Sequence, residues 1–325
     1  MSTAAGLMLG YAADLLLADP RRGHPVAGFG RAASALERHT WRDERRAGIA
    51  HVAVLVGGAA LVGLTAERVR RPVPHTLLTA LATWSVLGGT SLDREGAAID
   101  AWLAAGDLPR ARRQLTHLVG RDTSRLDESE VVRAAVESLA ENTSDAVTAP
   151  LVWGAVAGMP GLLGYRAANT LDAMVGHRSA RYERFGWAAA RLDDLVNLPG
   201  SRLTAALAVL LGADRRGAWR AWRRDASGHP SPNAGPVEAS FAGALGITLG
   251  GTNTYGERVE HRPVMGQGRP PQLNDLDRAR SLARRVGAAA VLVAAVSARR
   301  GPRRRGPRPT TAAAASAQPA PRRAR

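Results

Sequence analysis

Residues 165–199 read YRAANTLDAMVGHRSARYERFGWAAARLDDLVNLP, a stretch that sets acids and carboxamides among residues typical of a buried helical layer. Its polar side chains include Asn169, Asp172, His177, Asp193, Asp194 and Asn197. Because an unpaired buried charge is strongly destabilising, such side chains must be paired, bind a metal or line a cavity. The stretch therefore predicts helices with a functional site between them.

Two further segments have the same mixed composition, residues 137–145 (ESLAENTSD) and 225–238 (DASGHPSPNAGPVE). In the first, Glu137 and Glu141 lie four residues apart on one helical face, where like charges repel. We therefore expect a cation beside them, either a metal or substrate, although a structural pair between Arg133 and Glu137 is the alternative. Together, the three segments predict one composite pocket.

Uncharged runs rich in Ala, Gly, Leu and Val recur along the chain, and several approach the ~20 residues that cross ~30 Å of hydrocarbon as a helix. Periodicity alone leaves open a soluble helical enzyme with buried core helices, a reading that the mean hydropathy of −0.15 also permits. Arginine-rich loops between the runs lower that mean. The runs are 50–66, 76–92, 146–165, 239–256 and 286–298, with weaker ones at 2–18 and 195–213.

The basic residues and the missing residue types exclude several classes of chemistry. The net charge is +16, but residues 299–325 alone hold nine arginines and no acid. That tail is also rich in Ala, Pro and Gly, so we expect it to be disordered and to act as a cytoplasmic anchor rather than bind nucleic acid. The chain has no cysteine and no lysine, which excludes thiolate nucleophiles, Schiff bases and the lysine of a phosphate-binding loop.

The segment from about 93 to 145 has no uncharged run and is amphipathic. Asp107 is placed to cap one helix, and Asp127 with Glu130 forms a capping box for the next. We expect these helices to lie in the cytoplasm as an insert in a single multipass catalytic domain that covers residues 1–298, followed by the tail 299–325.

Two of the runs contain residues that break a membrane helix. Run 146–165 holds Pro150, Pro160 and Gly161, and run 195–213 holds Pro199 and Gly200. If both runs crossed the membrane, the polar segments would emerge on opposite sides and could not form one pocket. We therefore predict that neither run crosses as a simple span, because broken helices at membrane depth are tolerated where protein buries them.

The three polar segments and further motifs, in this order along the chain, resemble the CobD/CbiB family of cobalamin biosynthesis, the adenosylcobinamide(-phosphate) synthases. The further motifs are Asp19-Pro20, His24-Pro25-Val26 and the sequence GTNTYG at 251–256. The resemblance runs from about residue 7 to 285. It implies an all-α, polytopic integral membrane protein in the cell membrane, with the C-terminal tail in the cytoplasm.

The same resemblance implies the reaction. An amide would join 1-aminopropan-2-ol, or its O-phosphate, to the free propionate carboxylate of adenosylcobyric acid. Because amide formation from a carboxylate is uphill in water, we expect ATP and Mg²⁺ as cofactors, although the chain has no recognisable nucleotide motif. Oxygen ligands suit Mg²⁺, and the sequence offers Glu141, Asp145 and Asp193 as metal ligands.

Roles for the remaining polar residues follow from residue type and resemblance. We expect Asp193, Asp194 and Glu141 to be catalytic, with His229 as general base because its ordinary pKa lies near neutrality. The opposing readings are a helix surface for the two aspartates, interhelical hydrogen bonds for Asn169 and Asp172, and solvated loops for the histidines. The expected substrate-binding residues are Asn169, Asp172, His177, Arg178, Asn233, Glu238 and His24.

Two other functions remain open at this point. A corrinoid-binding membrane carrier or scaffold would need the membrane and the pocket but no clustered acids and no nucleotide. A basic nucleic-acid protein would lose binding with the tail, and the chain has no basic and aromatic recognition motif. The partners we expect are therefore the corrinoid, the amino alcohol or its phosphate, membrane lipid and other enzymes of the cobalamin pathway, with no nucleic acid.

Overall fold

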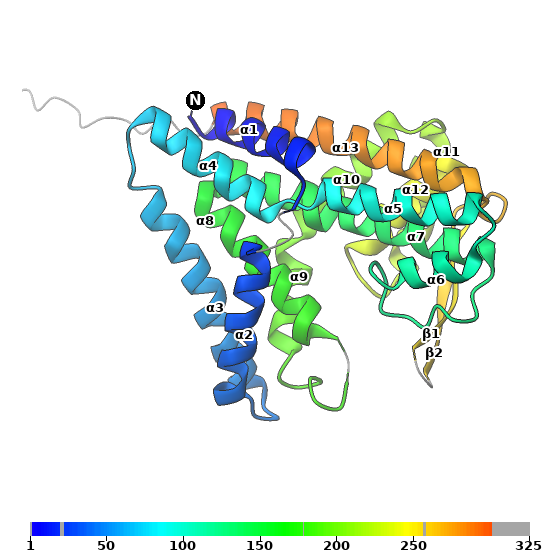
Figure 1. Ribbon diagram of the computed structural model, residues 1–325, viewed down its shortest axis with the longest axis horizontal. Coiled ribbons are helices and arrows are strands. Elements are labelled where there is room, and N and C mark those ends of the chain that lie inside the picture. Colours follow the sequence, from blue (N-terminus) through cyan, green and yellow to red (C-terminus); the bar gives the residue numbers. More distant parts are fainter. Residues whose placement is uncertain (1, 20–22, 178, 256–257, 301–325) are drawn as a thin grey trace, which may run out of the picture.

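The computed structural model describes residues 2–19, 23–177, 179–255 and 258–300 (Figure 1). The predicted all-α class is confirmed, since one short hairpin is the only sheet in these residues. The first helices are α1 (Ser2–Leu17), α2 (Pro25–Thr40), α3 (Arg45–Ala66), α4 (Pro72–Val86), α5 (Gly89–Ala104), α6 (Leu108–Leu115) and α7 (Glu128–Thr143). Then come η1 (Ser144–Thr148), α8 (Ala149–Leu171), η2 (Asp172–Gly176), α9 (Trp187–Val196), α10 (Leu198–Leu211), α11 (Arg215–Asp225), η3 (Ala226–Gly228), α12 (Ala234–Leu245), β1 (Leu249–Tyr255), β2 (Arg258–Met265) and α13 (Leu273–Arg300).

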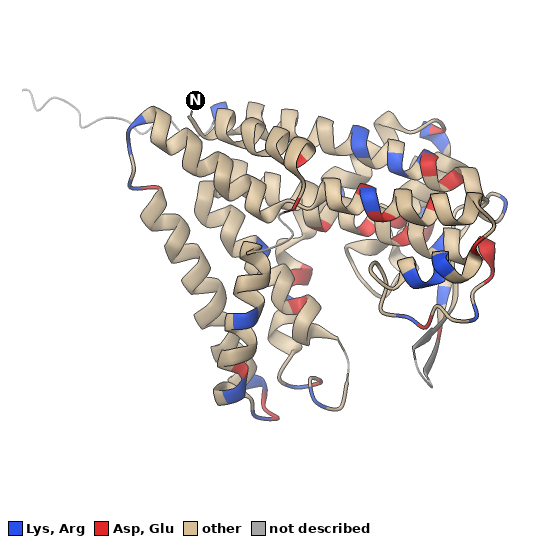
Figure 2. Ribbon diagram, in the orientation of Figure 1, with Lys and Arg blue, Asp and Glu red and all other residues tan. Residues whose placement is uncertain are grey.

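Charged and uncharged parts of the molecule are separated in space. Figure 2 shows few charges on α1, α3, α4 and the later half of α13, whereas α5, α6, α11 and the first half of α13 carry many. Large apolar side chains such as Leu61, Val62, Leu77 and Leu292 are more than half exposed in the uncharged part. Apolar surface of this extent in contact with solvent is typical of a face that meets lipid.

The helices long and apolar enough to cross a membrane are α3, the continuous stretch Glu128–Gly176 and α13, among the residues that the structure describes. The pair α9 and α10 would add a fourth, but it is bent by 46°. α1 is apolar but shorter. The prediction of a helical membrane protein is thereby supported.

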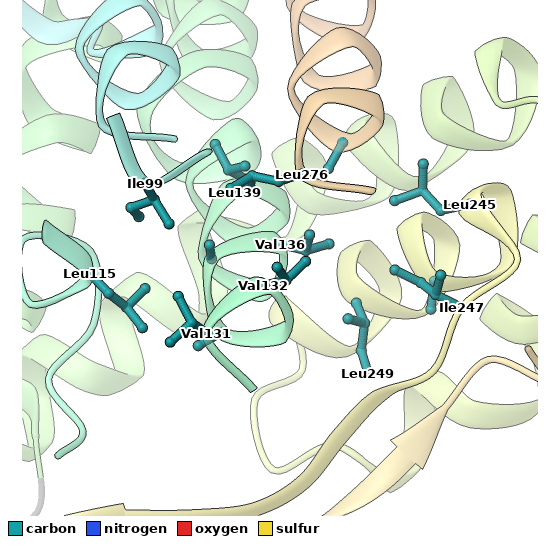
Figure 3. Packing of buried hydrophobic residues seen from close by; sticks show 14 of the residues in the cluster. Ile99, Leu115, Val131, Val132, Val136, Leu139, Leu245, Ile247, Leu249 and Leu276 are labelled. Carbon is teal, nitrogen blue, oxygen red and sulfur yellow. The ribbon is translucent and has the colours of Figure 1, made fainter. Parts of the chain in front are cut away.

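The charged half is built around α7, whose residues 131–140 are all buried. Figure 3 shows its side chains Val131, Val132, Val136 and Leu139 packed among residues of α5, α6, α12, β1 and α13. The predicted N-caps are confirmed, with Asp107 accepting from the Arg110 amide and the Asp127 and Glu130 box closed in both directions. α7 is the central helix of the charged half, because its many small Ala and Val residues let neighbours pack on every side.

The segment 145–172 folds back on itself, as the predicted break in run 146–165 requires. Gly158 adopts φ +67° and ψ −147°, a conformation that strongly favours glycine, and Pro160 follows it. The Asn169 amide therefore comes within 3.4 Å of an Asp145 carboxylate oxygen, whereas a straight helix would separate residues 24 apart by ~36 Å. Glu67 stabilises the bend by accepting from the Met159 amide at 3.0 Å.

Three other expectations about the runs are wrong. Run 239–256 does not form one helix, because α12 ends at a left-handed Gly246 and the chain continues into the antiparallel hairpin β1–β2. Run 76–92 is divided at Leu87 and Gly88, between α4 and α5. The arginine-rich segment 21–46, expected as a loop, contains α2, which begins at Pro25.

Candidate functional site

A pocket of about 190 Å³ lies where η1, η2, α9 and the start of α12 meet. We call it the acid pocket because five carboxylates line it and, among the described residues, no arginine does. All three polar segments of the sequence contribute, so the structure brings them together as one site. The lining residues are Glu141, Ser144, Asp145, Asp172, Asp193, Asp194, Asn197, Ser231, Asn233, Ala234 and Val237.

Two π-helical turns place carboxylates at the acid pocket. η1 carries Asp145 directly after α7, and η2 begins with Asp172 directly after α8. A π-turn widens the helix and redirects the following side chains, and such turns occur frequently at functional sites. Because α8 folds back between them, both ends of this 28-residue segment reach the same pocket.

Carboxamides hold the central acids in place. The Asn169 side-chain amide donates to Asp145 at 3.4 Å and to Asp193 at 3.3 Å, so it bridges the two carboxylates. The Asn197 amide donates to the other Asp145 oxygen at 2.6 Å, and its own oxygen accepts from Ser144. The hydrogen bonds to Asp145 therefore come from neutral amides, and no arginine forms an ion pair with it among the residues that the structure describes.

The opposite wall of the pocket differs, because arginines contact its polar groups. Arg191 donates to the Asp194 carboxylate at 3.3 Å, which is the bracing partner that the sequence suggested for one aspartate of the pair. Asn233 donates to the Asp194 backbone oxygen, and its own side-chain oxygen accepts from Ser201 and Arg202 at 2.9 Å each. Asn233 thus joins the loop before α12 to α9 and α10.

The cation expected between Glu137 and Glu141 is part of the protein. Arg121 donates to Glu137 at 2.6 Å, and both side chains are almost fully buried. Arg133 lies 3.7 Å from the same carboxylate, which also accepts from the Gly250 amide. The functional reading of Glu137 is therefore wrong, while Glu141 is exposed and lines the acid pocket.

His229 and Glu238 lie beside the pocket but do not line it. His229 Nδ1 accepts from the Ser231 amide, and its Nε2 is 3.7 Å from a Glu238 oxygen. Burial lowers the pKa of His229, with Arg262 adding to the effect. Burial also raises the pKa of Glu238 well above its usual range, helped by Glu137 and Glu141. Both shifts favour a neutral pair near neutral pH.

The remaining predicted residues lie outside the acid pocket. His24 caps α2 by accepting from the Val26 amide, and it pairs with Asp19 at 3.3 Å. His177 follows η2, is exposed, and packs edge-on against Tyr182. Arg178 lies outside the described residues, as do residues 301–325 of the predicted tail.

The sequence did not single out Arg121, Ser144, Ser201 or Ser231. Ser144 and Ser231 lie inside two of the polar segments, so only their neighbours drew attention. Arg121 pairs with Glu137 across 16 residues and a loop, a separation that no helical period predicts.

The oxygen donors of the acid pocket fit Mg²⁺ in type but not as a complete shell. Within the described residues, no group of three acids or histidines is close enough to hold a metal ion. Mg²⁺ in nucleotide enzymes is commonly held by one or two carboxylates, with phosphates and water as the other ligands. Asp145 and Asp193, which Asn169 holds together, are the pair suited to that mode.

Comparison with known proteins gives one family. The profile of the family described as CobD/Cbib protein matches residues 7–283. Among relatives named "Cobalamin biosynthesis protein CobD", that of Mycobacterium tuberculosis (strain CDC 1551 / Oshkosh) is 52% identical over 304 residues, covering 92% of this chain and 97% of the relative. That of Rhodobacter capsulatus is 44% identical (90% and 96% covered), and that of Chromobacterium violaceum is 41% identical (92% and 100%). No solved structure matches the chain.

Proposed function

The chain belongs to the CobD/Cbib family, and from this premise we propose that it is a cobalamin-biosynthesis enzyme that forms an amide. The bond would join the amine of 1-aminopropan-2-ol, or of its O-phosphate, to the propionate carboxylate of adenosylcobyric acid. The observation that carries the proposal is the acid pocket, in which five carboxylates from two of the three polar segments line a small cavity.

The size and charge of the pocket suit the smaller substrate. A cavity of about 190 Å³ accommodates an amino alcohol but not a corrin macrocycle. Other carboxylates of the pocket, such as Asp172, attract an ammonium group and can orient it by accepting its hydrogen bonds. The corrinoid would then present its propionate at the mouth, beside the exposed Glu141.

The pocket must also remove a proton from the ammonium group of the substrate. An ammonium group is not nucleophilic, so one carboxylate of the pocket must accept a proton before the nitrogen attacks. Neutral His229 has the right protonation state for a base, but it faces Glu238 and not the cavity. Its predicted role as general base therefore requires residues 229–233 to move when substrate binds.

We propose Asp145 and Asp193 as the residues that would hold Mg²⁺, with phosphates and water as its other ligands, because no group of three acids among the described residues is close enough for Glu141 to complete the set. When bound, Mg²⁺ and ATP would supply the phosphoryl group that activates the propionate. Asn169 keeps Asp145 and Asp193 side by side for this purpose. We further propose that the apolar half lies in the cell membrane and that the tail 299–325 is cytoplasmic, where arginines meet anionic lipid.

The test is a reconstituted reaction. Purified full-length protein in detergent is given adenosylcobyric acid and either the amino alcohol or its phosphate, with Mg-ATP present or withheld, and products are identified by mass spectrometry. We expect the amide only when Mg-ATP is present. If the protein retains the corrinoid but forms no product in any mixture, it is a corrinoid carrier and not an enzyme. Product without nucleotide would refute the cofactor proposal alone.

A further inference from the structure

A second cavity, of about 330 Å³, lies between α2, α3, α4 and α8 (Figure 1). We call it the Arg166 cavity. It shares no lining residue with the acid pocket, and most of its walls are apolar, with Val26, Phe29, Val62 and Leu163 among them. Val62 is 61% exposed, so the cavity opens onto the exposed apolar surface of α3.

Arg166 is the one charged side chain in this lining, among the described residues. Its Nη1 donates to the Asn169 side-chain oxygen at 3.3 Å, and its Nε is buried without a hydrogen bond. Nη2 also makes no hydrogen bond within the described residues, but it is not one of the atoms that the protein buries. Nη2 is therefore the atom that a ligand in the cavity can reach.

The described part of the chain supplies no counter-ion for this arginine. Asp19 and Asp145 are near enough to act on Arg166 electrostatically, but neither forms an ion pair with it. Asp19 pairs with His24, and Asp145 accepts hydrogen bonds from Asn169. An unpaired charge among apolar side chains is costly. Ionisable residues within apolar helical layers therefore mark sites where a ligand or partner supplies the missing charge.

The walls restrict the ligand to an anion with an apolar body. The hydroxyls of Ser85 and Thr170 donate to backbone oxygens of their own helices, at Ala82 and Arg166, and so offer little to a polar ligand. A free hydrated anion would lose its water against such walls, whereas a hydrocarbon chain gains from burial there. Basic pockets between membrane helices bind the phosphates of lipid head groups in this way.

The position of Arg166 along α8 suits the head group of a lipid. Asn169, one turn later, belongs to the polar network of the acid pocket, and Leu163, one turn earlier, lies in the apolar wall. The guanidinium thus lies at the boundary between polar and apolar parts of the molecule. A phosphate meets an acyl chain at the same kind of boundary in a bilayer.

We propose that the Arg166 cavity binds one anionic phospholipid. Its phosphate accepts hydrogen bonds from Arg166 Nη2, and one acyl chain lies against Phe29, Val62 and Leu163. The proposal depends on the contact of the apolar helices with lipid and not on the reaction proposed for the acid pocket.

The experiment compares two lipids on full-length protein purified in detergent. The protein is titrated with phosphatidylglycerol or with phosphatidylcholine of the same acyl chains, and native mass spectrometry counts the lipids retained. Both lipids carry the phosphate, but choline compensates its charge in the second. A phosphatidylglycerol with a photoreactive diazirine on one acyl chain then locates the site through crosslinked peptides.

We expect wild type to bind one phosphatidylglycerol about tenfold more tightly than phosphatidylcholine, the scale of a hydrogen bond to a charged group. Crosslinks should fall on α2, α3 and α8. Arg166→Met should remove the preference, and Arg166→Lys should keep most of it. Arg184→Met is the matched control, because it removes the same charge at a side chain that is 65% exposed and outside the cavity. It should bind as wild type does.

Ala59→Leu provides a second test that leaves the contact between Arg166 and Asn169 intact. Ala59 lines the cavity from α3, so a larger side chain should exclude the acyl chain and abolish both binding and crosslinking. Ala53→Leu, at an exposed position of the same helix, should have no effect.

Three results would overturn the proposal. Equal binding of the two lipids by wild type would show that the cavity does not select an anion. Equal losses in Arg166→Met and Arg184→Met would mean that the lipid responds to overall surface charge. Wild-type binding in both Arg166→Met and Ala59→Leu would place the lipid elsewhere on the protein.

Discussion

Glu137 and Glu141 lie one turn apart on α7 and have opposite surroundings. Glu137 is buried, accepts from the Gly250 amide and pairs with Arg121 and Arg133. Glu141 is exposed and faces a pocket whose lining includes four more acids and no arginine. The sequence predicted a cation beside both residues and named Glu141 alone as a catalytic residue and metal ligand.

The difference shows which acids serve the fold and which are available for chemistry. Arginines compensate Glu137, so its charge joins α7 to the loop before it and to β1. Neutral amides hold Asp145, and its charge is left to act on whatever enters the pocket. A preorganised, uncompensated charge of this kind is what stabilises a transition state electrostatically.

The largest effect should follow from breaking the compensated cluster. Glu137→Ala removes the carboxylate that the buried Arg121 contacts, and removing one member of a buried pair costs about 3–5 kcal/mol. We expect severe loss of folded protein, measured as melting temperature and as yield of monodisperse protein in detergent. The double variant Arg121→Met with Glu137→Met should recover much of the loss, because Arg121 is removed together with the carboxylate and Arg133 keeps the Gly250 carbonyl as an acceptor. Normal stability of Glu137→Ala would show that this carboxylate is not the structural one.

The acids of the pocket should show the reverse pattern, with turnover lost and stability kept. Asp193→Asn and Glu141→Gln each remove a charge with little change of shape, and we expect turnover to fall by about 10²-fold or more. Asp194→Asn should have the smaller effect, because Arg191 already compensates that carboxylate. The assay is the amide-forming reaction, with corrinoid binding as the control. If both Asp193→Asn and Glu141→Gln turn over as fast as wild type, these acids do not take part in the reaction.

Much of this arrangement could be predicted from the sequence, where local rules decide. The caps at Asp107 and Asp127 and the break near Pro160 follow from residues close together in the chain. The gathering of the three polar segments was predicted from the composition that they share. The informative signal was the presence of acids in apolar helices, because a buried acid must be paired, bind a metal or line a cavity.

The rest depended on contacts between distant residues. Arg121 reaches Glu137 through a loop, and β1–β2 replaces a helix because Gly250 and Gly251 take positive φ angles in a run that looked uniformly apolar. His229 had the composition of a ligand-binding loop, yet its ring turns toward Glu238. The direction in which a side chain of a loop points is set by packing, and residue type does not reveal it.

The smallest effect concerns Glu238, a buried acid whose carboxyl group lies 3.7 Å from the His229 ring. Its pKa is raised in the folded state, so the folded protein binds more protons than the unfolded chain above the ordinary glutamate pKa of about 4.3, and stability falls as pH rises from there. Glu238→Gln removes this titration. We therefore expect the variant to gain stability relative to wild type between pH 5 and pH 8, measured as the difference in melting temperature at the two pH values. His229 acts at the acid end, because its lowered pKa makes both proteins lose stability below about pH 6.5. A difference that stayed constant with pH would mean that Glu238 is ionised and paired in the folded protein, which would place it with Glu137 and not with a neutral pair.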